Sequence, residues 1–168
     1  DDPWDTAVSE KGDGVGSRDK FRIRIYNMSD RTIKLERKHK EGAYIKKDSL
    51  SLTRDECERI IAGDIRCLFD RPEPEAKAFY GIFRTRTLKP KVLVDYTREP
   101  YVFPAEDVRI TFDKNVRTGM RSTDLFDPDV PTYPVWDLKG CMILEVKFNA
   151  SLPEFCRSIV QMAASRHT

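Results

Sequence analysis

Apolar and polar residues alternate along several stretches of the chain, which is the pattern of strands with one apolar and one polar face. The first stretch is Phe21–Tyr26, in which Arg22 and Arg24 alternate with apolar residues. Turn-forming residues follow at 27–30, and the strand pattern then resumes. Further strands are expected at 32–40, 44–47, 92–98, 108–113 and 141–148.

Helices are expected in three parts of the chain, at 53–63, at 73–87 and from 151 onward. Thr53 and Glu56 have the spacing of a capping box, and the helix that this box begins should end near Gly63. The polar stretches 1–20 and 122–134 contain Gly, Asp or Pro and indicate loops. Together these patterns predict an α+β fold, with an antiparallel sheet joined mostly by hairpins and a few helices packed outside it.

The length of 168 residues is that of a single domain. Charged residues make up 35% of the chain, against about 25% in an ordinary globular domain. The 30 Lys and Arg residues nearly cancel the 28 Asp and Glu residues and leave a net charge of +2. This balance excludes a uniformly basic nucleic-acid-binding surface, so the placement of the charges on the strands becomes the informative feature.

The four cysteines and two histidines have neither the spacing of a zinc site nor that of a disulfide framework. We therefore expect reduced thiols and a cytoplasmic protein. No apolar run approaches the roughly 20 residues of a membrane span, so no membrane segment is expected in this chain.

Each of the clearest predicted strands has one apolar and one charged face. In the second strand the charged face comprises Lys34, Glu36, Lys38 and Lys40. One interpretation is a sheet whose charged face lies in water. The other is a barrel with the charged faces inward, where a polyanion and a divalent cation would occupy the lumen. Like charges directly opposite one another destabilise a sheet, which argues against a face that only contacts solvent.

Five segments, in the order in which they occur, resemble the VTC domain, the polyphosphate polymerase branch of the triphosphate tunnel metalloenzymes, or CYTH-like superfamily. They are 21–26, 35–40, 44–48, 95–98 and 143–147, and the opening segment 1–7 adds to the resemblance. The resemblance covers nearly the whole chain as one domain. It implies an antiparallel β-barrel with helices outside it and a tunnel lined by Arg, Lys and Glu.

The resemblance also implies roles for individual residues. The phosphate-binding residues would be Arg22, Arg24, Lys38, Lys46, Arg98, Arg109 and Lys147. Of these, the residues acting in catalysis would be Arg22, Arg24, Lys38 and Arg98. The family's metal-binding glutamate corresponds to Glu145, with Glu36 as a second ligand for Mn²⁺ or Mg²⁺.

The implied reaction moves the γ-phosphoryl group of ATP onto a polyphosphate chain. The alternatives are hydrolysis of triphosphate or polyphosphate in the same tunnel, and a polyphosphate-binding module without turnover. Nucleic acid is not expected, because only Tyr26 and Tyr96 are interleaved with the basic residues. Relative to the family, an N-terminal strand and a C-terminal end segment lie outside these 168 residues, so we expect an incomplete barrel.

Overall fold

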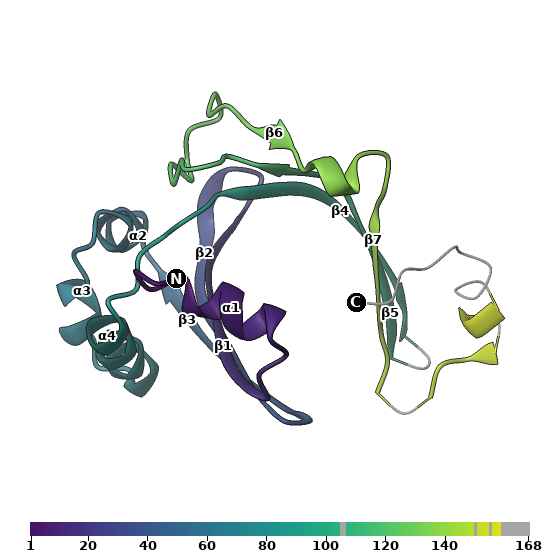
Figure 1. The fold of residues 1–168 in the computed structure, drawn as a ribbon, viewed down its shortest axis with the longest axis horizontal. Coiled ribbons are helices and arrows are strands. Elements are labelled where there is room, and N and C mark those ends of the chain that lie inside the picture. The colour runs from purple at the N-terminus through teal and green to yellow at the C-terminus, as the bar shows by residue number, and fades with distance from the viewer. Residues whose placement is uncertain (105–106, 150, 155, 159–168) are drawn as a thin grey trace. The chain divides into compact units, whose positions relative to one another are not determined.

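The structure is a computed structural model that describes residues 1–104, 107–149, 151–154 and 156–158 (Figure 1). The fold is α+β, and every strand pair in it is antiparallel, as the sequence predicts. The chain groups into two compact units, of which unit 1 holds residues 1–93 and 121–131. Unit 2 holds residues 94–120 and the described residues from 132 onward. Each unit contains one sheet.

The sheet of unit 1 has the strand order β1-β2-β3. Its strands are β1 (Ser17–Tyr26), β2 (Ser29–Glu41) and β3 (Tyr44–Leu52). Asn27 and Met28 join β1 to β2 with φ angles of 51° and 54°. Two successive positive φ angles match a hairpin turn to the twist of its strands. The strands are longer than the sequence pattern predicts, and β3 in particular continues past Lys47 to Leu52.

The helices of unit 1 are α1 (Thr6–Gly12), α2 (Arg54–Ile61), α3 (Arg66–Phe69) and α4 (Pro74–Arg86). The capping box before α2 is confirmed, because the Glu56 N–H donates to Thr53 Oγ1 at 3.2 Å and the Thr53 N–H donates to Glu56 Oε2 at 2.7 Å. Residues 1–20 were expected to form a loop, but the structure has α1 and the start of β1 in this stretch. The Asp2 carboxylate organises the beginning of α1 by accepting the Thr6 N–H at 2.9 Å.

The core of unit 1 lies between one face of its sheet and the helices α2, α3 and α4 (Figure 1). The sheet contributes the buried side chains of Ile33, Leu35, Leu50 and Leu52. Phe79 and Phe83 on α4 meet the ring of Phe21 edge to face, with centroid distances of 6.5 and 5.6 Å. These contacts hold the sheet against α4, so most of its basic side chains lie on the opposite face.

The sheet of unit 2 is built around one central strand. The strands are β4 (Val94–Phe103), β5 (Val108–Thr118), β6 (Tyr133–Pro134) and β7 (Ile143–Lys147), and the short helix η2 (Trp136–Leu138) precedes β7. β5 pairs with β4 along one edge and with β6 and β7 along the other. Asn115, with a φ of 53°, lies where the register between β4 and β5 shifts.

The predicted barrel is not confirmed. The strands in the described part of the chain form two separate sheets, and none of the pairings found there joins one sheet to the other. Residue 154 and residues 156–158 are helical, as expected for the helix after 151, and the rest of that expected helix lies outside the described residues. Within the described ranges, no helix is long and apolar enough to cross a membrane.

Candidate phosphate-binding site

One face of the unit 1 sheet is strongly basic, and we call it the cationic face. Its side chains follow from the alternation along each strand and from the register of the hairpins. The paired rows of this face contain Ile45, Ser49 and Ser51 and nine charged residues, which are Arg18, Lys20, Arg22, Arg24, Lys34, Glu36, Lys38, Lys40 and Lys47. Eight of these nine charged residues are basic, so the cationic face has a large excess of positive charge.

Glu36 is the carboxylate on the cationic face, and it bridges two arginines of β1. Its Oε2 atom pairs with Arg22 Nε and lies 3.3 Å from Arg24 Nη2. Arg24 Nη1 also donates to the Tyr26 hydroxyl at 3.1 Å. Glu36 therefore orients the Arg22–Arg24 pair that the sequence predicts as phosphate ligands. Its expected role as a second metal ligand stays a prediction.

Three lysines lie directly opposite one another on the three strands of unit 1. Lys20 on β1 pairs with Lys38 on β2, and Lys38 pairs with Lys47 on β3. We call this set the lysine row. Like charges in such positions repel one another. Desolvation and the neighbouring positive charges of Lys11, Arg18 and Lys38 lower the pKa of Lys20.

Lys46 was expected to bind phosphate together with Arg22, Arg24 and Lys38, and the structure corrects this grouping. The turn at Gly42 and Ala43 sets Glu41 opposite Tyr44, which puts Lys47 opposite Lys38. Lys46 therefore lies on the helix-facing side of the sheet, where its Nζ atom is 3.2 Å from Asp48 Oδ1. A shift of one residue moves a strand side chain to the other face, which is why the sequence alone did not separate the two lysines.

Lys20 and Lys47 are the basic residues of the row that were not among the predicted site residues. A signal for Lys47 was available, because a two-residue turn between β2 and β3 would have determined its partner. Lys20 precedes the clear alternation that starts at Phe21, and it lies in the stretch expected to be a loop. Its place in the row depends on the pairing of β1 with β2.

The sheet of unit 2 also has a polar face. Its polar and charged residues are Tyr96, Arg98, Arg109, Thr111, Asp113, Glu145 and Lys147, and Pro100, Val102 and Ile143 lie on the same face. Arg98 Nε and Nη2 donate to Asp113 Oδ1 and Oδ2, both at 2.6 Å. The hydrogen bonds to Asp113 are the main reason that the pKa of Arg98 is raised. The guanidinium carbon also lies 5.3 Å from the centre of the Tyr96 ring.

Glu145, the predicted metal ligand, lies on β7 opposite Thr111 of β5. Its Oε1 atom is 3.2 Å from Lys147 Nζ, and its side chain is 43% exposed. The Thr111 hydroxyl is buried and has no hydrogen-bond partner among the described residues. Arg109 lies opposite Lys147, so this face also places two cations side by side.

The structure therefore gathers the predicted residues into two sets. Arg22, Arg24, Glu36 and Lys38 lie together in unit 1, and Arg98, Arg109, Glu145 and Lys147 lie together in unit 2. Across the described ranges of the chain, no group of three or more His, Cys, Asp or Glu residues is placed to hold a metal ion. A single carboxylate such as Glu145 is a suitable ligand for a hard cation when phosphate oxygens supply the remaining ligands.

Comparison with known protein families gives one result. A family model described as the VTC domain matches residues 1–167, which is almost the entire chain. Neither the curated proteins nor the solved structures include a significant match.

Proposed function

The chain belongs to the VTC domain family, and from this premise we propose that it is a polyphosphate polymerase-like phosphotransferase. Family membership indicates a function related to polyphosphate. The proposed reaction transfers the γ-phosphoryl group of ATP to a polyphosphate chain. The observation that carries the proposal is the excess of eight basic side chains over one carboxylate on the cationic face. Such a surface suits a ligand with several adjacent negative charges.

The residues of unit 1 would bind and orient the phosphates. Arg22 and Arg24 are held by Glu36, which presents their guanidinium groups in defined orientations. Lys38 adds a compact charge beside them, in register with Lys20 and Lys47. Phosphoryl transfer depends mainly on positioning and on electrostatic stabilisation, so this chemistry needs no acid–base pair.

The basic residues of unit 2 would also bind phosphate groups. Asp113 holds the Arg98 guanidinium by two hydrogen bonds, and Arg109 and Lys147 lie on the same face of the sheet. We propose that this face also binds phosphate groups of the polyanion. What supports this proposal is that each sheet has one polar face bearing Arg, Lys and Glu.

We further propose that Glu145 and Glu36 are ligands of divalent cations, Mn²⁺ or Mg²⁺. The support is chemical, since carboxylate oxygens are the ligands these ions prefer. When bound, such an ion would supply positive charge that offsets the negative charge of the phosphates. We also propose a reducing, cytoplasmic setting, because the spacing of the four cysteines is not that of a disulfide framework.

The test is to incubate the protein, and any longer natural chain that contains it, with ATP and Mn²⁺ or Mg²⁺, and to separate the products by size. Polyphosphate chains longer than triphosphate, absent in Lys38→Ala, are the expected result. Release of only ADP and orthophosphate would contradict the polymerase and favour a hydrolase. Binding of polyphosphate without any turnover would leave a binding module.

A further inference from the structure

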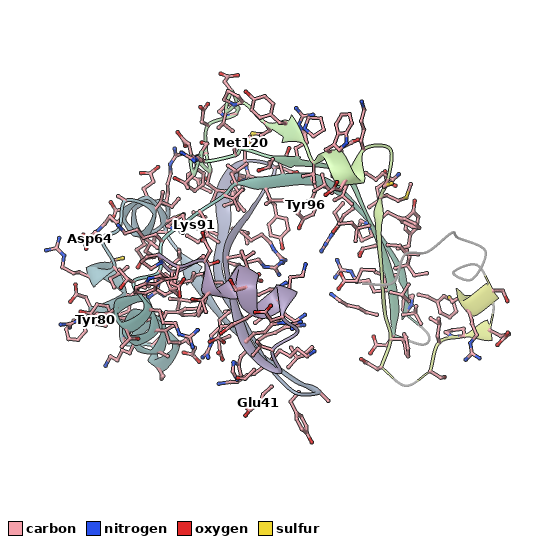
Figure 2. All side chains as sticks on the ribbon, in the orientation of Figure 1. Glu41, Asp64, Tyr80, Lys91, Tyr96 and Met120 are labelled. Atoms are coloured by element: carbon pink, nitrogen blue, oxygen red, sulfur yellow. The ribbon has the colours of Figure 1, made fainter. Side chains whose placement is uncertain are left out.

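Behind the lysine row, the helix-facing side of the unit 1 sheet changes from apolar to charged. Its buried apolar residues on β2 and β3 end at Leu35 and Leu50. The next positions on this side are Arg37 and His39 on β2, and Asp48 and Lys46 on β3. Phe21 of β1, opposite Arg37, still packs on α4. Beyond it the sheet reaches the β2–β3 turn next to Glu41 (Figure 2), and this side carries Asp19, His39 and Lys46 in place of apolar residues.

Asp19 of β1 is the centre of the charged cluster at this end of the sheet. Its side chain is 2% exposed. Arg37 Nε and Nη2 donate to its two carboxylate oxygens at 2.8 and 3.2 Å. His39 Nδ1 lies 2.8 Å from Oδ1, and Arg86 of α4 lies 2.9 Å from Oδ2. Burial opposes ionisation of Asp19, but the hydrogen bonds from Arg37 and His39 and the positive charges of Arg37 and Arg86 together lower the pKa of the carboxyl group.

Asp19 and its partners on β2 are sequence neighbours of two lysines of the lysine row. Asp19 precedes Lys20 on β1, and Arg37 and His39 are the two neighbours of Lys38 on β2. Neighbouring residues in a strand point to opposite faces, so the Asp19 carboxylate lies behind the sheet while the lysines lie in front of it. One buried carboxylate thus holds the backbone on both sides of Lys38 and ties β1 to the last turn of α4.

We propose that Asp19 is a positioning residue, which holds the lysine row in register for binding a linear phosphate polyanion. This inference rests on the proposed function, because it assumes that the cationic face binds such a ligand. Asp19 does not contact the ligand in this proposal. It stabilises a strand pairing that sets three mutually repelling lysines opposite one another, at the edge of the apolar packing between Phe21 and α4.

The direction in which Asp19→Asn changes the affinity for polyphosphate distinguishes a positioning role from a simple effect of charge. Asp19→Asn removes a negative charge near a basic surface, so the change in the electrostatic field alone would strengthen the binding of an anion. Loss of positioning has the opposite sign, because Arg37, His39 and Arg86 lose their common partner and the lysines lose their fixed register. A purely structural role would lower the melting temperature and leave the affinity of the folded protein unchanged.

The experiment measures the dissociation constant of sodium polyphosphate of defined chain length, at several salt concentrations, for the wild-type chain and Asp19→Asn. The matched control is Asp64→Asn. Asp64 is also ion-paired with two arginines, Arg59 and Arg66, each at 2.9 Å, but it lies between α2 and α3 (Figure 2). We expect Asp19→Asn to bind about tenfold more weakly at low salt and to show a shallower salt dependence. Asp64→Asn should bind like the wild type.

A second variant covers the case in which Asp19→Asn does not fold. Arg37→Lys keeps the charge but loses the planar fork that makes two hydrogen bonds to Asp19. It should bind polyphosphate about threefold more weakly, although the net charge of the protein is unchanged. Unaltered or tighter binding by folded Asp19→Asn, or unaltered binding by Arg37→Lys, would overturn the proposal. If the wild-type chain itself binds no polyphosphate, the proposed function fails and this inference fails with it. If the wild type binds polyphosphate, Lys38→Ala weakens the binding and Asp19→Asn does not, only the positioning role of Asp19 is rejected.

Discussion

Arg98 and Asp113 face each other across β4 and β5 and form two parallel hydrogen bonds of 2.6 Å. The Asp113 side chain is 12% exposed and that of Arg98 is 28% exposed. Such a two-point contact holds the plane of the guanidinium group as well as its position. Arg98 is therefore fixed in orientation by a neighbouring strand before any anion binds, as Arg22 and Arg24 are by Glu36.

Asp113→Asn should lower the free energy of unfolding by about 2 kcal/mol, because it removes a charged partner from a partly buried pair. Urea denaturation measures this change. Glu99→Gln is the control, since Glu99 also pairs across β4 and β5, with Lys114 at 2.7 Å, but with both side chains more exposed. Glu99→Gln should lower the free energy of unfolding by less than about 1 kcal/mol. Equal losses in the two variants would contradict the special role of the Arg98–Asp113 pair.

Lys47→Ala and Lys46→Ala test the register of β2 and β3. Lys47 is in the lysine row, whereas Lys46 pairs with Asp48 on the helix-facing side. We expect Lys47→Ala to weaken polyphosphate binding several-fold at low salt, with a smaller effect at high salt because ions screen the interaction. Lys46→Ala should bind nearly as the wild type does. The reverse order of effects would show that the ligand contacts the other face.

Glu145→Gln tests the proposed metal ligand. We expect it to abolish metal-dependent turnover while polyphosphate binding through the basic residues persists. Removing the divalent cation from the wild-type protein with EDTA should cause the same loss, and adding Mn²⁺ should restore only the wild type. Glu99→Gln, a carboxylate change on the other face of the same sheet, should keep its turnover. Wild-type turnover with unchanged metal dependence in Glu145→Gln would leave Glu145 as the ion-pair partner of Lys147.

Glu73 gives a prediction for acid pH. The hydrogen bond from Arg71 is the main reason that the pKa of Glu73 is lowered to about 2. The unfolded chain has a glutamate pKa of about 4.3, so the carboxylate stabilises the fold above that pH and loses its effect as the pH falls toward 2. The melting temperature of Glu73→Gln should therefore lie below that of the wild type at pH 7 and approach it near pH 2.5. A constant difference across this range would mean that the carboxylate charge is not the cause.

The cysteines should differ in reactivity. Burial raises the pKa of the Cys57 thiol to about 11 and also raises the pKa of Cys67. Cys141 is exposed. Thiolates are the reactive form, so iodoacetamide at pH 8 should label Cys141 much faster than Cys57 or Cys67 in the folded protein. Mass spectrometry of digested samples measures the labelling, with urea-unfolded protein as the control, and rapid labelling of Cys57 in the folded chain would contradict its burial.

The features that the sequence predicted correctly depend on neighbours within a few residues. The Thr53–Glu56 capping box involves a spacing of three residues, and it appears in the structure with both of its hydrogen bonds. The alternation in β1 placed Arg22 and Arg24 together, and the same pattern in β7 placed Glu145 beside Lys147. The helix α1 was missed because the Asp2 carboxylate that organises its start lies in a polar stretch with no apolar periodicity.

By itself, the sequence determined which side chains share a face within one strand, because alternation is a local property of the extended backbone. Only the tertiary structure decided which strand positions lie opposite one another, and so separated Lys47 from Lys46. It also decided which carboxylates hold the basic residues. Asp19 and Asp113 meet their arginines across 18 and 15 residues of sequence, through strand pairing. Register and partner choice depend on turn geometry and on packing between distant segments, and no periodicity along the chain records them.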